Sequence, residues 1–286
     1  GIVASTIKDL GIIKMIDERI GTSNKEIITT GEAVAGMILN GLGFTSEPLY
    51  LSQYFFEGKP LANLFGKDHL TPENFNATKL SHSLDDVYEY GLEKLFFEIA
   101  VESCALERIE DRFNSLDTTS ISLNGEYDVE CDEQEILVTQ GFSKDRRPDL
   151  KQVIHELLVS QDGGIPLMSK TWSGNASDNK IFKDRAKALV VHFSKTDFIN
   201  YLIADSKLYT KDNAENLQKI KFITRIPNSI SKVNDLIAEA LAKKQWQPLT
   251  EKDQYFVQEV THYGIAQRWI VVHSLAANTR AKKSVE

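Results

Sequence analysis

The sequence has little cysteine and no long apolar run, and each absence excludes a class of protein. It contains 2 cysteines in 286 residues, too few for a disulfide framework and without the spacing of a zinc site. We therefore expect reduced thiols and a cytoplasmic location. No stretch approaches the ~18 consecutive apolar residues of a transmembrane helix, and no basic stretch precedes an apolar leader. We expect neither a membrane partner nor secretion.

Basic residues are missing from one part of the chain. Residues 114–140 hold seven acids and no Lys or Arg, within a formal net charge of −8. The preceding residues, 1–113, hold 10 bases against 18 acids, whereas residues 141–286 hold 23 bases against 16 acids. This asymmetry indicates an acidic portion and a basic one, and the basic one could face a polyanion. On charge alone, scattered solvated lysines explain it equally well.

The first 110 residues have the apolar spacing of helices. We expect one helix over residues 3–21, a second after a Thr cap in "TTGEAVAGMILNGLGF", and a long one over residues 83–109 capped by Ser83. Short helices are expected in "SEPLYLSQYFF" and "PLANLFG". The acidic balance favours a helical packing or dimerisation domain over one that reads DNA by itself.

From residue 111 the pattern changes to strands. Strands are expected in "RFNSLDTTSISLNG" and "EQEILVTQGF", and a hairpin in "KQVIHELLVSQDGGIPLMSKTW" around its Gln-Asp-Gly-Gly turn. Then follow a basic helix over 178–194, a strand ending in Asp205, a helix over 211–220 and a strand over 221–227. The expected fold class is α/β, with a mixed sheet that is antiparallel first and parallel later. A helix and antiparallel strands occupy the remainder.

Two aspartates occupy matching places in this order. Strands disfavour Asp, and an unpaired buried carboxylate is costly, so Asp117 indicates a wrong strand assignment, an ion pair or a metal ligand. In a ribonuclease H-like sheet its strand is adjacent to the one that ends in Asp205, and the two carboxylates meet at one edge. Mg²⁺ prefers such oxygen ligands, and two such ions support phosphoryl transfer.

Three segments carry a family resemblance: "LDTTSISLNGEY", "QGFSKDRRPDLKQVIHELLVSQDGGIPLMSKTWSGNASDNKIF" and "LIADSKLYT". They resemble bacterial insertion-sequence transposases of the DDE type, in the IS-four group, and the likeness extends to the helical domain before the nuclease. It implies a ribonuclease H-like fold, DNA strand cleavage and transfer, and two Mg²⁺ or Mn²⁺ ions. Asp117 matches the first D and Asp205 the second. The resemblance also implies that the partner is double-stranded DNA, that a homodimer assembles on it, and that the protein is bacterial and nucleoid-associated.

The chain departs from the family pattern at its third acid. In the family the final Glu lies in a Tyr-Arg-Glu signature after a β-rich insertion, and no such signature follows Arg225. Residues from about 246 onward resemble the start of that insertion. We therefore expect a transposase fragment or a naturally shortened, inactive copy. Its parts are a helical domain over 1–110, an incomplete catalytic core over 111–245 and the start of the insertion over 246–286.

Polar and aromatic residues after the strands are candidate DNA contacts. The candidates are Lys144, Arg146, Arg147, Trp172 and Asn175. A solvated loop is the alternative for the three bases, and core packing is the alternative for Trp172. The bases Lys183, Arg185 and Lys187 are expected on a solvated helix face.

Two other functions remain open. A non-catalytic DNA-binding or oligomerisation protein derived from a transposase fits the missing third acid. A ribonuclease H-like repair nuclease is a further alternative, which would cleave flaps or junctions without preference for element ends.

Overall fold

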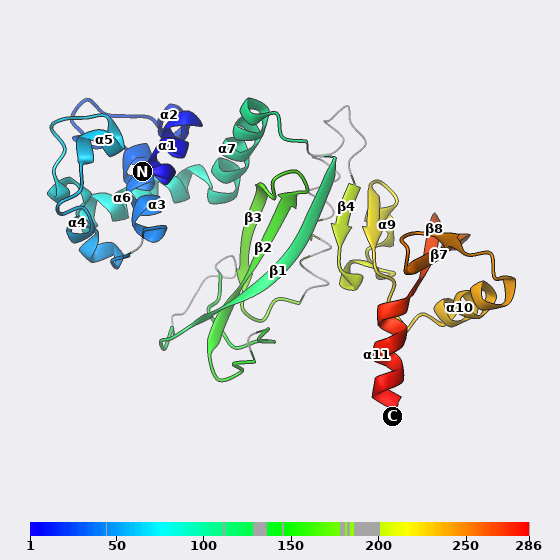
Figure 1. Ribbon diagram of the computed structural model, residues 1–286. Helices are drawn as coiled ribbons and strands as arrows, with labels where there is room; N and C mark the ends of the chain where they lie inside the picture. Colours follow the sequence, from blue (N-terminus) through cyan, green and yellow to red (C-terminus); the bar gives the residue numbers. More distant parts are fainter. Residues whose placement is uncertain are drawn as a thin grey trace. The chain divides into compact units, whose positions relative to one another are not determined.

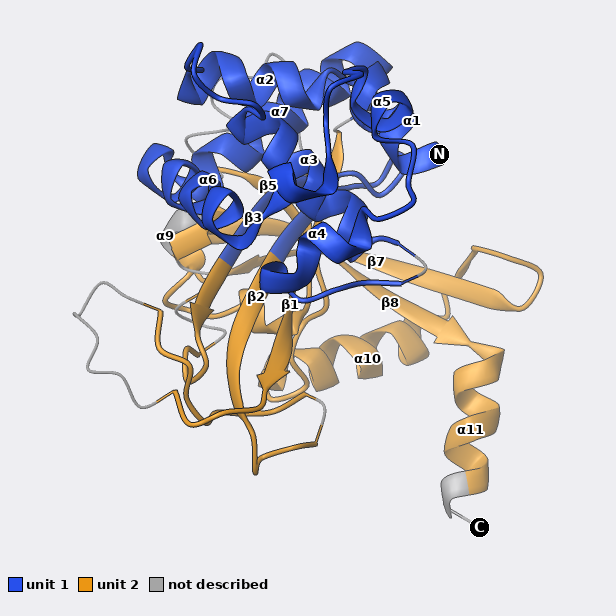
Figure 2. Cartoon of the chain, turned by 90° about the vertical axis from the view of Figure 1, so that its left-hand side faces the viewer, with its two compact units in different colours: residues 1–111, 157–170 blue, residues 112–156, 171–286 orange. Residues whose placement is uncertain are grey.

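The chain divides into two compact units, one of residues 1–111 and 157–170 and one of residues 112–156 and 171–286 (Figure 2). The structure is a computed structural model. It describes residues 1–43, 45–110, 112–127, 136–144, 146–177, 181, 184–185 and 201–285. Within these residues, none of the helices combines the length and apolar character needed to cross a membrane.

The first unit is built mainly from helices. They are α1 (Ile2–Asp9), α2 (Ile12–Ile20), α3 (Thr30–Gly41), α4 (Ser52–Phe55), α5 (Leu61–Phe65), α6 (Ala77–Tyr90) and α7 (Leu92–Glu107), with 3₁₀ turns at Leu49–Leu51 and Pro72–Phe75. Phe56 and Phe75 lie at the centre of its core, with ring centroids 4.3 Å apart. The helical character expected for this region is confirmed.

Two expected helices are each interrupted by a glycine. Gly11 has φ 70° and separates α1 from α2, whereas Gly91 has φ 104° and separates α6 from α7. A positive φ cannot continue a right-handed helix, so single helices over 3–21 and 83–109 were wrong predictions. Ser83 is buried inside α6 and is not its cap; Asn76 caps that helix by accepting from the Lys79 amide.

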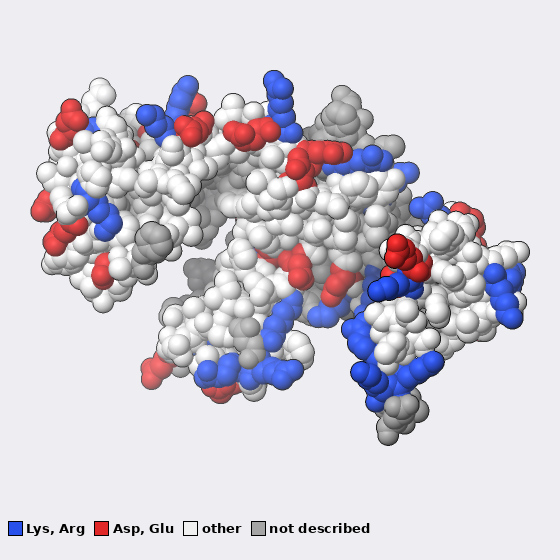
Figure 3. Space-filling view, in the orientation of Figure 1, with Lys and Arg blue, Asp and Glu red and all other residues white. Residues whose placement is uncertain are grey.

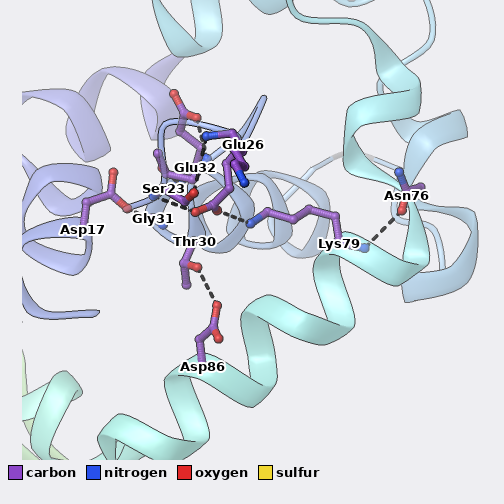
Figure 4. A network of polar contacts seen from close by, with 11 residues as sticks. Asp17, Ser23, Glu26, Thr30, Gly31, Glu32, Asn76, Lys79 and Asp86 are labelled. Carbon is purple, nitrogen blue, oxygen red and sulfur yellow. Dashed lines mark hydrogen bonds and ion pairs between the residues drawn. The ribbon is translucent and has the colours of Figure 1, made fainter. Parts of the chain in front are cut away.

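Polar contacts around the start of α3 connect it to α2 and α6 (Figure 4). The expected Thr cap is confirmed, because Thr29 and Glu32 form a capping box. Asp17 accepts a hydrogen bond of 2.8 Å from the Gly31 amide, and the Thr30 hydroxyl donates to Asp86. Burial raises the pKa of the Asp17 carboxyl. These contacts orient three helices around one helix N-terminus.

A five-stranded mixed sheet follows the helices (Figure 1). Its strands are β1 (Phe113–Leu123), β2 (Lys151–Ser160), β3 (Pro166–Ser173), β4 (Tyr201–Ala204) and β5 (Lys221–Thr224). Their order is β3-β2-β1-β4-β5, with β4 parallel to both β1 and β5. This is the strand order expected for a ribonuclease H-like sheet, and the α/β fold class is confirmed.

The Gly-Gly turn between β2 and β3 also agrees with expectation, since Gly163 and Gly164 both have positive φ. A strand over residues 133–142 was a wrong prediction for the residues described there. Residues 136–142 form no strand, and their one β contact is an isolated bridge between Thr139 and Gln152. The helix expected over 178–194 falls largely outside the described residues.

The chain after β4 alternates helix and strand and then forms a second sheet. Its elements are a 3₁₀ turn (Ser206–Leu208), α9 (Ala214–Leu217), α10 (Ser231–Lys243), β6 (Gln247–Pro248), β7 (Asp253–His262), β8 (Ile265–Ser274) and α11 (Leu275–Val285). The second sheet has the order β6-β7-β8 with antiparallel pairing. The antiparallel strands expected near the end of the sequence are therefore confirmed.

Candidate metal centre

Asp117 and Asp205 directly follow a register pair of two parallel strands. Leu116 of β1 is the Cα partner of Ala204, the last residue of β4. Adjacent parallel strands lie about 4.8 Å apart, so the next residues on the two strands, Asp117 and Asp205, are neighbours at the rim of the sheet. Asp117 lies within β1, whereas Asp205 begins the 3₁₀ turn after β4.

The two aspartates also share one face of the sheet. Four residues earlier, Phe113 and Tyr201 are register partners whose rings stack with centroids 5.1 Å apart. Side chains alternate between faces with a period of two, so positions 117 and 205 lie on the face that carries this ring pair. In β1 the opposite face is the buried one, with Leu116 and Thr118 both buried.

The sequence suggested that Asp117 is a buried carboxylate, and this prediction was wrong. Its side chain is 85% exposed, and Asp205 is exposed as well. One oxygen of each carboxylate accepts a 2.8 Å hydrogen bond from a nearby amide, that of Thr118 for Asp117 and that of Lys207 for Asp205. In the described part of the chain, the second oxygen of each is not hydrogen-bonded. Asp205 thus caps the 3₁₀ turn and keeps an oxygen for a further ligand.

Lys144 is the predicted DNA contact that the structure brings to this site. Its Nζ lies 3.9 Å from Oδ1 of Asp117 and donates to the Thr118 hydroxyl at 2.9 Å and to the Thr118 carbonyl. Its backbone amide donates to the Ser120 hydroxyl, which fixes the loop against β1. The ammonium group reduces the negative charge beside Asp117.

Over the described residues, none of the other predicted DNA contacts is hydrogen-bonded or ion-paired to Asp117 or Asp205. Arg147 forms an exposed bidentate pair with Asp149, with an Nη2–Oδ2 distance of 2.7 Å, and this pair raises the pKa of Arg147. Arg146 and Asn175 are exposed, and Arg146 has a positive φ of 58°.

A buried ion pair next to Trp172 was missed from the sequence. The indole Nε1 of Trp172 donates to Glu156 at 2.7 Å, and Arg185 donates from Nε to the other Glu156 oxygen. Glu156 and Arg185 are both buried, so the prediction that Arg185 lies on a solvated helix face was wrong. Lys183 and Lys187 lie outside the described residues. The only signal in the sequence was a charged Glu156 within an apolar strand; the structure shows that it shares the buried face with Ile154 and Leu158.

Tyr209 connects the turn that begins at Asp205 to the second sheet. Its hydroxyl donates to Gln267 at 2.8 Å and lies 2.9 Å from Nδ1 of His262. Burial raises the pKa of Tyr209 and lowers the pKa of His262, and Lys232 lowers the pKa of His262 further.

Thr224 of β5 donates a hydrogen bond of 2.7 Å to the Asp205 carbonyl. Asp205 is thus held from two sides by backbone and side-chain contacts.

No group of three or more His, Cys, Asp or Glu side chains is arranged to hold a metal ion among the residues that the structure describes. In the described part of the chain, Asp117 and Asp205 are therefore the two candidate ligands that can be named. The expected Mg²⁺ or Mn²⁺ is compatible with their chemistry, because carboxylate oxygens are the ligands that hard divalent ions prefer.

The family comparison matches only the first part of the chain. The family described as "Domain of unknown function (DUF4277)" matches residues 1–101. None of the curated proteins matches the sequence. The family match covers the helical residues and leaves the sheet with its two aspartates outside.

Similar solved structures are transposases. A piggyBac transposase synaptic complex with hairpin DNA matches 93% of this chain at 8% identity, with a TM-score of 0.42, and the chain spans 58% of that protein's length. A Mos1 transposase paired-end complex with the left transposon end matches 80% of this chain and 84% of its own at 13% identity, with a TM-score of 0.27. A Mos1 mariner paired-end complex with Mn matches 82% of this chain and 90% of its own at 12% identity, with a TM-score of 0.26.

Proposed function

We propose that this chain is the DNA-processing part of a DDE-type transposase, resembling the insertion-sequence enzymes of the IS-four group. One observation carries the proposal: the Leu116–Ala204 register makes Asp117 and Asp205 neighbours on one face at the rim of the sheet. The sequence resemblance assigns these two positions to the first two acids of the motif. The full reaction would be strand cleavage at element ends followed by strand transfer to target DNA.

The two carboxylates fit a divalent cation by their chemistry and their accessibility. Both side chains are exposed, and each keeps one oxygen that is not hydrogen-bonded within the described residues. Bound Mg²⁺ or Mn²⁺, as one ion or two, would supply activation of a nucleophilic oxygen and stabilisation of the leaving oxygen. Asp117 and Asp205 would hold the metal, and the rigid parallel register would keep their spacing fixed.

Lys144 adds a positive charge at the same rim. Its ammonium group lies 3.9 Å from Asp117 and is anchored by Thr118, so it is positioned to orient a DNA phosphate next to the metal ligands. Arg146 and Arg147 extend the positive charge along the same exposed loop. Asn175 and Trp172 complete the proposed DNA contacts, with Trp172 acting through its ring because its indole N–H is bonded to Glu156.

The proposal extends to the organisation of the chain. Residues 1–110 form a helical domain, 111–245 form a catalytic core that lacks its third acid, and 246–286 form the start of an inserted β-rich region. The active assembly is a homodimer on duplex DNA in the bacterial cytoplasm, at the nucleoid.

Metal-dependent DNA binding tests the proposal. Fluorescence anisotropy of a labelled 30-base-pair duplex is measured with Mn²⁺ and with EDTA, for the unmodified chain and for Asp117→Asn/Asp205→Asn. We expect Mn²⁺ to tighten binding by the unmodified chain, because a metal held by both carboxylates also binds a phosphate oxygen. The double variant should lose this gain, and Glu251→Gln, an exposed acid elsewhere in the same unit, should keep it.

Binding that is equally tight with Mn²⁺ and with EDTA would favour a non-catalytic DNA-binding protein over the nuclease. Preference for a branched junction over the linear duplex would favour a repair nuclease.

A further inference from the structure

The end of the described chain is basic and contains no acid. Between Tyr263 and Glu286 the sequence has no Asp or Glu, and it has four bases, Arg268, Arg280, Lys282 and Lys283. Arg268 lies on β8 directly opposite Glu259 of β7, an arrangement in which opposite charges attract across a sheet. The other three bases all lie on α11.

Helix α11 buries none of its side chains fully over the residues whose exposure the structure describes, 275–283. Every residue from Leu275 to Lys283 is exposed except Asn278, which is partly buried. α11 therefore presents its three bases to solvent.

The three bases of α11 have no carboxylate partner among the residues that the structure describes. Among the described residues, some exposed bases elsewhere pair with an acid, as Arg147 does with Asp149, and others such as Lys25 do not; α11 differs because it carries three such bases within four residues. Figure 3 shows Lys and Arg side chains gathered over α11, at the lower right of the view. This helix is a cationic surface whose charge is not offset locally.

We propose that α11 contacts the phosphate backbone of duplex DNA through Arg280, Lys282 and Lys283. The inference rests on the proposed function, in which duplex DNA is the partner, and it adds a contact surface beyond the loop that carries Lys144. Charge complementarity is the reason: the DNA backbone carries one negative charge per ~1.7 Å of helix axis. Arg280 and Lys283 are three residues apart, so they lie on one side of the helix.

An anionic membrane is a poorer partner for this helix. Helices that lie in a membrane surface need an apolar face with large side chains such as Trp, Phe or Leu. The sequence of α11, LAANTRAKKSV, has Leu275 and Val285 as its only large apolar residues, and they lie at opposite ends. The positive charge is thus not combined with an apolar face that could enter lipid.

The test is the salt dependence of DNA binding. The variant Arg280→Gln/Lys282→Gln/Lys283→Gln is compared with the unmodified chain on a 30-base-pair duplex by anisotropy, from 0.05 to 0.3 M salt. We expect affinity to fall at least about tenfold at 0.15 M, and the slope of log K against log salt to become shallower by up to about 2.7. Circular dichroism establishes that the variant keeps its fold.

A matched control removes the same charge elsewhere. Lys8, Lys14 and Lys25 are exposed in the helical unit, and replacing all three by Gln should leave DNA affinity within about twofold. An equal loss in this control would overturn the inference, because net charge alone would then explain the effect.

Three further results would also overturn it. In the first, the α11 variant binds DNA as tightly as the unmodified chain, whereas Lys144→Ala/Arg146→Ala/Arg147→Ala binds more weakly. This result would overturn the inference about α11 but not the proposed function. The second is an unmodified chain that binds no duplex, which would overturn both. The third concerns vesicles of phosphatidylcholine and phosphatidylserine. If the α11 variant loses affinity for these vesicles while its affinity for DNA is unchanged, the partner of α11 is a membrane.

Discussion

At the scale of single residues, the environment of a carboxylate decides what it can do. Asp117 and Glu156 both lie on strands of one sheet, but Asp117 is exposed at the rim and Glu156 is buried. Glu156 uses both oxygens, one for Arg185 and one for Trp172, and so has a structural role. Asp117 keeps an oxygen for a ligand. Residue type and strand assignment alone do not separate the two.

Removing Glu156 should destabilise the fold strongly. In Glu156→Ala, Arg185 would keep a buried positive charge without its carboxylate, a situation that costs about 3–5 kcal/mol. Urea denaturation should show a loss of free energy of unfolding in that range. The exposed-acid variant Glu251→Ala should change it by no more than about 0.5 kcal/mol. A loss below about 1 kcal/mol in Glu156→Ala would show that the pair does not hold this part of the fold.

Neither half of this ion pair was predictable from the sequence. The strand face opposite Glu156 carries Val153 and Leu157 and is at least as apolar, so the period of two does not decide which face is buried. Its partner was not predictable either, because Arg185 lies in a segment whose sequence also fits a solvated helix. Only the tertiary placement of that segment distinguishes the two possibilities.

At the scale of elements, apolar periodicity predicted where helices and strands lie but not where they break. The apolar spacing continues across Gly11 and Gly91, so it predicted one helix where the positive φ of each glycine produces two. The segment 136–142 has the apolar composition of a strand. In place of a ladder it makes one isolated bridge to Gln152, side-chain hydrogen bonds, and a close approach of its backbone to Gly174.

That close approach predicts a strong effect of a small substitution. A Cβ on Gly174 would clash with the backbone carbonyl oxygens of Gln152 and Thr139. Both obstacles are backbone atoms, so Gly174→Ala must displace either β2 or the segment before Lys144. We expect a loss of about 2 kcal/mol or more in free energy of unfolding, measured by urea denaturation.

Gly41→Ala is the matched control for this prediction. Gly41 lies in the last turn of α3, and an added Cβ there meets no atom within 4 Å. Ala is favoured over Gly in a helix by up to about 1 kcal/mol, so this variant should be neutral or slightly stabilised. Equal stability of Gly174→Ala and Gly41→Ala would contradict the close packing at Gly174.

At the scale of the whole molecule, the order of elements determined what could be predicted about the site. Hairpin-linked strands followed by alternating helix and strand predicted the central β1–β4 neighbours, and therefore the pairing of positions 117 and 205. The position of Lys144 beside Asp117 was not predictable, because it depends on contacts of an irregular loop with Thr118 and Ser120. Such contacts leave no periodic signal in the sequence.

The most direct measurement is a Mn²⁺ titration of the unmodified chain, Asp117→Asn, Asp205→Asn and the double variant, followed by electron paramagnetic resonance of free Mn²⁺. Replacing even a residue that only hydrogen-bonds to a metal ligand typically lowers metal affinity by about 10-fold. If one ion lies between both carboxylates, each single variant should therefore lower the affinity for Mn²⁺ by more than that. The double variant should then lose little more, because the site is already lost. Losses that simply add, or single variants that bind Mn²⁺ as tightly as the unmodified chain, would show that Asp117 and Asp205 do not share a metal.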